Sequence, residues 1–262
     1  FAATLTGIDL QLGGANATLH VTGGTLHVYS SAGSMLVTGD EFGLSATLGP
    51  VSASASHVSF TYNPTAIADW SFAGGPANAD TNVTEVSGGA TSVTVGDLGS
   101  LQVDSFSVKR QLGVNGGDLF TLHLTGITLH LGGSSTTLDI SGGTLDVASF
   151  VVGGAGELYV AGSEFHLSAT LGLVSATADH VSFTYNPGTR TDWSADGGPA
   201  HVDAALTQVS GGATSVTVGD LGSLGVTSFT VTKKGADLFS LHLAGITLHL
   251  GGNTTTLDVT GG

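Results

Sequence analysis

The chain of 262 residues contains no cysteine, only 5 prolines and few charged residues. Without cysteine there are no disulfides, no thiolate nucleophile and no Cys-type zinc site. Charged residues make up 10% of the sequence, well below the roughly 25% of an ordinary soluble domain. These absences remove several catalytic and structural chemistries and point to a chain of small, uncharged side chains.

Basic residues are especially scarce, since 5 Lys and Arg stand against 20 Asp and Glu, for a formal charge of −15. This balance argues against nucleic acid as a partner, because phosphate neutralisation needs a Lys/Arg surface. It argues equally against an anionic membrane surface. No run of 18 apolar residues predicts a membrane span. Residues 1–14 lack a basic n-region and belong to a repeat, so they do not read as a signal peptide.

Glycine is abundant at 42 residues, and hydrophobic residues reach 40%, most of them small and aliphatic. Polar and apolar residues alternate with period two in Ser92–Val95, Thr128–Leu131 and Thr137–Ile140, which places Leu, Val and Ile on one face of a strand and Thr, Ser, His and Asp on the other. Gly-Gly, Gly-Asp and Asn-Pro interrupt these runs as turn signals. We find no stripe of helical period, so the sequence predicts an all-β protein.

The sequence repeats itself with a period of 119 residues. The segments beginning at Phe120 and Phe239 are identical at 18 of 24 positions, and a weaker version begins at Phe1. Between Val28 and Glu41 the offset to the next copy changes from 119 to 123 and later returns to 119. We therefore divide the chain into repeat 1 (1–119), repeat 2 (120–238) and the start of a truncated repeat 3 (239–262). Because it begins and ends within a repeat, we expect a segment of a longer protein.

Two all-β architectures agree with this pattern. A frame L-x-V-x-S-F-x-V begins at Leu101, Leu145 and Leu224, which suggests smaller blocks of about 40 residues inside the long repeat. Small side chains, scarce proline and Gly-rich turns favour a β-solenoid built from 119-residue repeats. The alternative is a row of β-sandwich domains, which usually need larger core residues.

Histidine is the first candidate ligand, with ten copies. His123 and His130 recur as His242 and His249, and paired imidazoles are zinc or copper ligands. In the first repeat, however, Thr4 and Gln11 take these places. We therefore interpret the histidines as members of an interchangeable polar strand face, without a confident metal site. Protonation of all ten would move the net charge from −15 to −5.

Calcium is the second candidate ligand. The segments GGSSTTLDI and GGNTTTLDV match the length of the calcium-binding nonapeptide but lack its second-position glycine and its aspartate position. Acidic Gly-rich turns remain, and hard oxygen ligands on such turns suit Ca²⁺. Asp97 and Asp220 are therefore weak calcium candidates; no other cofactor is expected.

The third candidate site is a pair of irregular segments, 62–76 and 185–199, which hold both tryptophans and four of the five prolines. Aromatic, amide and acidic side chains on a loop are suited to a sugar or to a neighbouring chain; the alternative is that each Trp packs on the β body and fixes its loop. The candidate residues of this ligand or chain-contact loop are Tyr62, Asn63, Asp69, Trp70, Tyr185, Asn186, Asp192 and Trp193.

Enzymatic motifs are missing from the sequence. There is no G-x-S-x-G, P-loop, H-E-x-x-H or helix-opening G-x-G-x-x-G. We therefore expect a non-enzyme.

The near-exact long repeat, the lack of cysteine, the acidity and the Gly/Thr/Val/Leu strands resemble the giant tandem-repeat surface proteins of bacteria, which are adhesin-like or fibre-forming. The resemblance implies an extracellular or cell-surface structural segment that associates with copies of itself and does not insert into a membrane. A second hypothesis is a multivalent module that binds surface polysaccharide through the two Trp loops.

Overall fold

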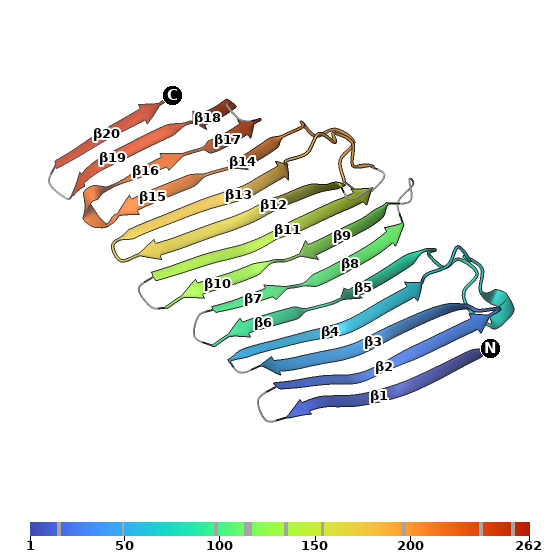
Figure 1. Cartoon of the computed structure of the whole chain (residues 1–262). Helices are drawn as coiled ribbons and strands as arrows, with labels where there is room; N and C mark the ends of the chain where they lie inside the picture. The colour runs from blue at the N-terminus through green and yellow to red at the C-terminus, as the bar shows by residue number, and fades with distance from the viewer. Residues whose placement is uncertain are drawn as a thin grey trace. The chain divides into compact units, whose positions relative to one another are not determined.

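The computed structural model describes residues 1–14, 17–48, 50–96, 99–112, 117–133, 136–152, 155–194, 198–235, 238–252 and 255–262 (Figure 1). The regular elements in these ranges are twenty strands and two short 3-10 turns, and all their described pairings are antiparallel. The all-β prediction is confirmed. Since successive β-rich runs are joined by short Gly-containing turns, antiparallel neighbours are the expected pairing.

The strands of the first half are β1 (Ala2–Gly14), β2 (Ala17–Ser31), β3 (Ser34–Leu48), β4 (Val51–Asn63), β5 (Val83–Gly88), β6 (Thr91–Val95), β7 (Gly99–Val103), β8 (Ser105–Leu112), β9 (Asp118–Thr125) and β10 (Thr128–Gly132), with η1 at Ser71–Ala73. Those of the second half are β11 (Thr136–Val152), β12 (Ala155–Leu171), β13 (Val174–Asn186), β14 (Leu206–Gly211), β15 (Thr214–Val218), β16 (Gly222–Val226), β17 (Ser228–Lys234), β18 (Leu238–Ala244), β19 (Ile246–Gly252) and β20 (Thr255–Gly261), with η3 at Gly219–Leu221.

The chain forms two compact units. Unit 1 comprises Phe1–Gly96, Gln102–Leu124 and Ala148–Gly156, and unit 2 comprises Asp97–Leu101, Thr125–Val147 and Glu157–Gly262. In unit 1, β1 to β4 form a meander of long strands, and the two halves of β4 pair with β6 and β5 respectively. In unit 2, the two halves of β13 pair in the same way with β15 and β14, followed by β16 and β17 and then β19 and β18. Each long row is thus continued by two half-strands placed end to end.

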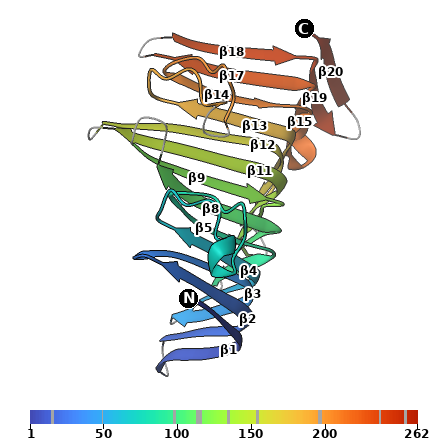
Figure 2. The same ribbon diagram turned by 90° about the vertical axis from the view of Figure 1, so that its right-hand side faces the viewer.

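The long rows bend at β-bulges. The register of β3 with β4 shifts between Gly39 and Phe42, and that of β12 with β13 shifts between Gly162 and Phe165. A bulge inserts an extra residue and bends its strand. In Figure 2 the half-strands of unit 2 diverge accordingly, since β14 and β17 lie across the view whereas β19 and β20 run steeply.

The bulges occupy equivalent sequence positions in the two units. Glu41 and Glu164 both have φ of 62°, and His57 and His180 both have φ of 50°. Non-glycine residues rarely adopt this left-handed conformation, and extra residues at bulges are one place where it occurs. The repeated segments EFGLSATLG and EFHLSATLG therefore share their backbone conformation as well as their letters.

Alternation along the strands separates the side chains of each unit into two faces. Directly paired residues share a face, so the registers Leu10–Val21, Leu44–Ala55 and Val216–Leu224 define an apolar face. The registers Gln11–His20 and His249–Asp258 define a polar face on the other side. The term apolar face is used below for the side carrying Leu, Val, Ile and Phe in either unit.

Phenylalanine rings lie over glycines of the neighbouring strand beside each bend. A Cβ on Gly39 would come within 2.2 Å of the Phe60 ring, and one on Gly162 within 2.3 Å of the Phe183 ring. The rings of Phe42 and Phe60 stack with centroids 5.9 Å apart. Aromatic rings that cover glycines replace the missing side-chain packing in a sheet. Phe42 and Phe165 are accordingly buried, although most of the apolar face is not.

The described residues bury few side chains. The buried set is small, and 28 large hydrophobic side chains are exposed, among them Leu5, Leu12, Leu250 and Leu257. The accessible surface is 14559 Å², whereas a compact monomer of 25.9 kDa exposes about 10,500 Å². Neither unit has a second layer of strands over its apolar face among the described residues, which accounts for the excess.

The architecture agrees only in part with the sequence prediction. The described strands form antiparallel meanders, whereas the coils of a solenoid stack as parallel strands, so the β-solenoid is not shown and stays a prediction. The fold does not test the repeat bounds 1–119, 120–238 and 239–262, which stay predictions too. The change of offset from 119 to 123 has a structural counterpart: β2 and β3 have 15 residues each, and β11 and β12 have 17 each. No helix in the described ranges is long and apolar enough to span a membrane.

Candidate functional site

The loop after β4 is organised around the side chain of Asn63, the last residue of that strand. Asn63 is fully buried, and its Nδ2 donates hydrogen bonds to the carbonyls of Ile67 (2.9 Å) and Asp80 (2.7 Å). Its Oδ1 accepts hydrogen bonds from the backbone N–H and the hydroxyl of Thr65. Asn-Pro thus starts the loop, and the amide then joins its two ends.

Trp70 is the second anchor of this loop. Its side chain is 0% exposed and its Nε1 donates a hydrogen bond to the Ile67 carbonyl at 2.9 Å. Leu36, on the polar-face side of β3, is also 0% exposed, so the loop creates a small core on an otherwise polar face. A Trp without exposed surface is not available to stack on a sugar in this conformation.

The loop after β13 repeats the arrangement with changed partners. Asn186 Nδ2 donates to the carbonyls of Arg190 (2.8 Å) and Asp203 (2.9 Å), and Trp193 is 0% exposed. The Arg190 guanidinium lies 4.4 Å from the Trp193 ring centroid, and the Tyr159 ring lies 5.7 Å from it. Burial and, second, the Asp146 carboxylate raise the pKa of Tyr159.

The two loops differ in how well the buried polar atoms are satisfied. Gly188 replaces the Thr65 of the first loop, and Asn186 Oδ1 and Trp193 Nε1 have no hydrogen-bond partner among the described residues. Unpartnered buried groups cost roughly 1–3 kcal/mol each. The second loop is therefore the weaker copy of the same design.

Asp69 and Asp192 are exposed turn residues. Asp69 Oδ1 accepts the Ser71 backbone N–H, and Asp192 Oδ1 accepts the backbone N–H and hydroxyl of Ser194. These hydrogen bonds, the serine side chain first, lower the pKa of both carboxyls. Each aspartate shapes the turn next to its Trp.

Tyr62 and Tyr185 are each 40% exposed and lie on the apolar face, away from the buried Asn and Trp. Of the eight predicted loop residues, the structure joins the Asn, Asp and Trp of each copy into one loop and separates the Tyr from them. A role of the loops in ligand or chain contact stays a prediction, and Tyr62 and Tyr185 are its accessible members.

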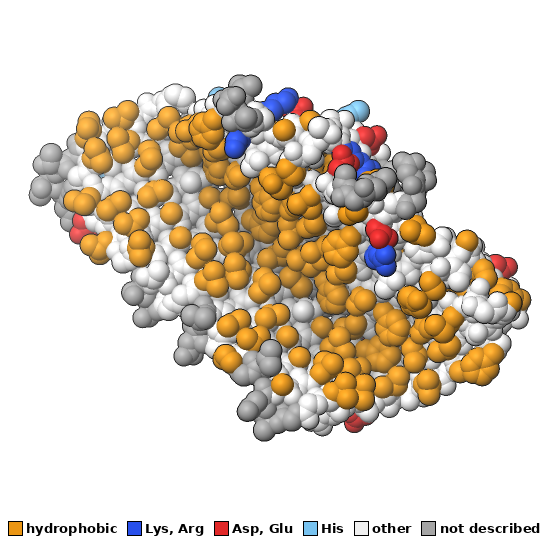
Figure 3. Space-filling view, in the orientation of Figure 1, with side chains coloured by type: hydrophobic (Ala, Val, Ile, Leu, Met, Phe, Trp, Pro, Cys, Tyr) orange, Lys and Arg blue, Asp and Glu red, His pale blue; other side chains and the backbone are white. Residues whose placement is uncertain are grey.

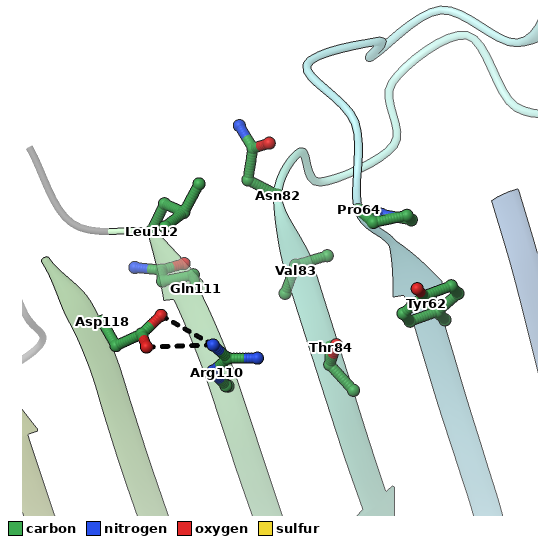
Figure 4. Close-up of a pocket in the computed structure, with 9 residues that line it drawn as sticks. All are labelled: Tyr62, Pro64, Asn82, Val83, Thr84, Arg110, Gln111, Leu112 and Asp118. Carbon is green, nitrogen blue, oxygen red and sulfur yellow. Dashed lines mark hydrogen bonds and ion pairs between the residues drawn. The ribbon is translucent and has the colours of Figure 1, made fainter. Parts of the chain in front are cut away.

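A cavity of about 220 Å³ lies beside Tyr62 (Figure 4). Arg110 Nη2 bonds to both carboxylate oxygens of Asp118 at 2.9 Å, and Thr84 pairs across the strands with Arg110. The remaining lining residues are Pro64, Asn82, Val83, Gln111 and Leu112. Arg110 and Asp118 are not predictable from the sequence, because only the strand register brings them to the same cavity as Tyr62, with β5 between β4 and β8.

The equivalent position in unit 2 carries different side chains. Lys233 takes the place of Arg110, and the larger hollow of unit 2, about 570 Å³, lies instead beside Tyr159, Thr184 and His201 under the second loop. The two copies therefore present different side chains, unlike a binding site that is repeated with the sequence.

The structure gives little support for calcium binding at Asp97 or Asp220. Asp97 lies outside the described residues. Asp220 is exposed on η3, and within the described ranges no group of three His, Asp or Glu side chains is placed to hold a metal ion. Calcium at Asp220 stays a prediction.

The polar face brings histidines and carboxylates together across the strands. Nδ1 of His180 lies 2.7 Å from Oε2 of Glu164, which is the first cause of the raised pKa of His180, followed by the Glu164 charge. The other pairs are His20–Asp9, His57–Glu41, His130–Asp139, His166–Asp179 and His249–Asp258. The alternation in the sequence predicts this polar face. It does not predict which histidine pairs with which carboxylate, because that depends on the strand register.

Comparisons with known proteins do not assign the chain to a family or a function. No protein-family model matches the chain, and no curated protein and no solved structure shows significant similarity to it.

Proposed function

We propose that this chain is a structural repeat segment of an extracellular bacterial fibre or cell-surface stalk, which gives length and stiffness and associates laterally or end to end with copies of itself. One observation carries the proposal: each unit is a meander of long strands whose apolar face is covered by no second layer within the described part of the chain. Soluble monomers rarely expose apolar patches of more than a few hundred Å² unless the patch is an interaction site.

The strand pairing supports a mechanical role. Rows of antiparallel strands are joined by backbone hydrogen bonds, and the same arrangement of halves occurs at β4–β6 and β13–β15. A sequence period of 119 residues, repeated along a longer chain, lengthens a sheet without new chemistry in each copy. This sequence period is also the reason why we propose a β-solenoid for the longer protein.

The polar face supports an aqueous, non-enzymatic role. Its histidines and carboxylates pair with one another in twos, and no catalytic motif is found in the sequence. Together with the charge of −15, this leads us to propose an exported, non-catalytic protein without a nucleic-acid or membrane partner.

The alternative function is an adhesin module that binds surface polysaccharide. The half-exposed Tyr62 and the Arg110–Asp118 pair line the same cavity, which favours it, since an aromatic ring and charged hydrogen-bonding groups around one hollow are suited to a sugar. The burial of both tryptophans and the replacement of Arg110 by Lys233 in unit 2 make it the second choice.

Electron microscopy of the purified chain over a concentration series tests the proposal. We expect filaments or laterally associated sheets. Particles that stay single at every concentration contradict the structural function.

Glycan-array binding of Tyr62→Ala and Trp70→Ala then separates the two functions. Loss of glycan binding in Tyr62→Ala, with an unchanged melting temperature, supports the adhesin. We expect Trp70→Ala to lower the free energy of unfolding by about 3–5 kcal/mol, because a fully buried aromatic side chain is removed.

A further inference from the structure

The apolar face of unit 2 is widest over β13, β15, β16, β19 and β20. Cross-strand registers continue from Val174 through Val218 and Gly222 to Leu250 and Leu257. Leu250 is 44% exposed and Leu257 is 57% exposed. Figure 3 shows hydrophobic side chains following the strands over this face, with few charged side chains among them.

This surface contains both a hollow and a projection. A cavity of about 350 Å³ is lined by apolar side chains that include Val216, Leu224, Leu248 and Leu250. Leu221, on η3 at its rim, is 73% exposed. A projecting leucine beside an apolar hollow is self-complementary across a two-fold axis, because each copy offers both parts.

The exposed area matches what a stable dimer buries. The chain exposes roughly 4,000 Å² more than a compact monomer of its mass. Obligate homodimers bury about 2,000–5,000 Å² in total, with an apolar interface core. Unit 2 holds about half of the chain, so its share of the excess is roughly 2,000 Å² per copy and roughly 4,000 Å² for a pair, which lies within that range.

The distribution of charge favours contact through the apolar face and disfavours anionic lipid as the partner. The chain carries a net charge of −15, and the histidine–carboxylate pairs such as His249–Asp258 lie on the polar face. Two apolar faces meet without bringing these carboxylates together. Anionic lipid is disfavoured as an occupant, since 5 Lys and Arg stand against 20 acids.

We propose that the apolar face of unit 2, centred on Val216, Leu224, Leu248 and Leu250, packs against the same face of a second copy of this chain. Two single-layered sheets then form a sandwich, whose facing layers lie about 10 Å apart. This inference rests on the proposed structural function and names the surface through which its lateral association occurs.

Sedimentation equilibrium of the whole chain with Leu250→Asp tests the inference. At concentrations below those that give filaments, we expect the wild type to form a species of twice 25.9 kDa. The variant places two carboxylates in each interface and weakens dimerisation roughly 100-fold or more. Thr247→Asp, on the same strand but the polar face, is the matched control and keeps the wild-type dissociation constant.

Hydroxyl-radical footprinting of the wild type gives a readout that does not depend on the variant folding. We expect oxidation of the β19 leucines to fall as the protein concentration rises through the dissociation constant. Phe72, which is 61% exposed on η1 of unit 1, remains equally reactive. Dimers with unprotected β19 leucines overturn the inference.

The remaining outcomes separate this inference from the proposed function. If Leu250→Asp stays folded by circular dichroism and associates like the wild type, the face pairing is wrong but an edge-to-edge structural role survives. If the wild type never associates, both fail. Co-sedimentation of the wild type with phosphatidylcholine vesicles, abolished by Leu250→Asp, assigns the face to lipid and overturns the second copy as its occupant.

Discussion

At the scale of single residues, one buried amide determines whether each loop closes. The Asn63 side chain connects Thr65 and Ile67 at the start of its loop to Asp80 at the end. Lys109 adds an ion pair to Asp80 at 2.7 Å, which fixes the end of the loop to β8. The irregular segment therefore has two defined ends and a Trp between them.

We expect Asn63→Ala to lower the free energy of unfolding by about 2–4 kcal/mol, because two backbone carbonyls lose their donor inside the loop. Urea denaturation followed by Trp fluorescence measures this change. The control is Asn78→Ala in the same loop, where the side chain is exposed. Equal effects of the two substitutions contradict the anchoring role.

Glycine under a phenylalanine ring is the second residue-scale feature. We expect Gly162→Ala to cost about 1–3 kcal/mol of stability, because the new Cβ meets the Phe183 and Phe165 rings at 2.3 and 2.6 Å. Gly133→Ala is the control, since a Cβ there has no atom within 4 Å. Thermal denaturation of both variants measures the loss of stability. An unchanged melting temperature of Gly162→Ala contradicts the prediction and shows that the rings move aside freely.

At the scale of elements, the bulges convert straight strands into bent rows. The sequence carries a signal for them: apolar residues occupy odd positions at Val37 and even positions at Phe42 and Leu44, a change of phase that an extra residue produces. Period-two alternation predicts the strands and their two faces. It does not predict which strands pair, because parallel coils and antiparallel rows need the same alternation.

The candidate site was predictable to a similar extent. Asn-Pro and the lone Trp mark the loops, and the possibility that Trp packs on the sheet follows from the sequence. The separation of Tyr62 from Trp70 does not, since it depends on which face each strand end presents. Arg110 and Asp118, which line the same cavity as Tyr62, come from strands 40 or more residues away in the chain.

The Glu164–His180 pair joins the two bulges of β12 and β13, and it predicts a pH dependence. Its hydrogen bond raises the pKa of His180 in the folded state, so the pair stabilises the fold fully below the unfolded value of 6.5 while Glu164 is ionised. This stabilisation is lost as the pH rises through the folded pKa.

We expect Glu164→Gln to bring the pKa of His180 back toward 6.5, which NMR titration of the imidazole measures. The difference in melting temperature between wild type and variant should be larger at pH 6 than at pH 8.5. A difference that is larger at pH 8.5 contradicts the assignment.

At the scale of the whole molecule, one side of each sheet carries the histidine–carboxylate pairs and the other is mainly apolar. Protonation of the ten histidines changes the net charge from −15 to −5, which weakens repulsion between copies. We expect association of the chain to be tighter at pH 5.5 than at pH 8, and less sensitive to salt. Sedimentation equilibrium at both pH values measures this; an equal dissociation constant contradicts it.

The strands β11 and β12, each two residues longer than β2 and β3, bear on how such a chain changes over generations. Neighbouring antiparallel residues alternate between hydrogen-bonded and non-bonded pairs, so a given tight turn suits only every second pair. One added residue per arm moves the turn to the wrong kind of pair, whereas two restore it. We therefore expect length variation in this hairpin to come in steps of four residues, two in each strand.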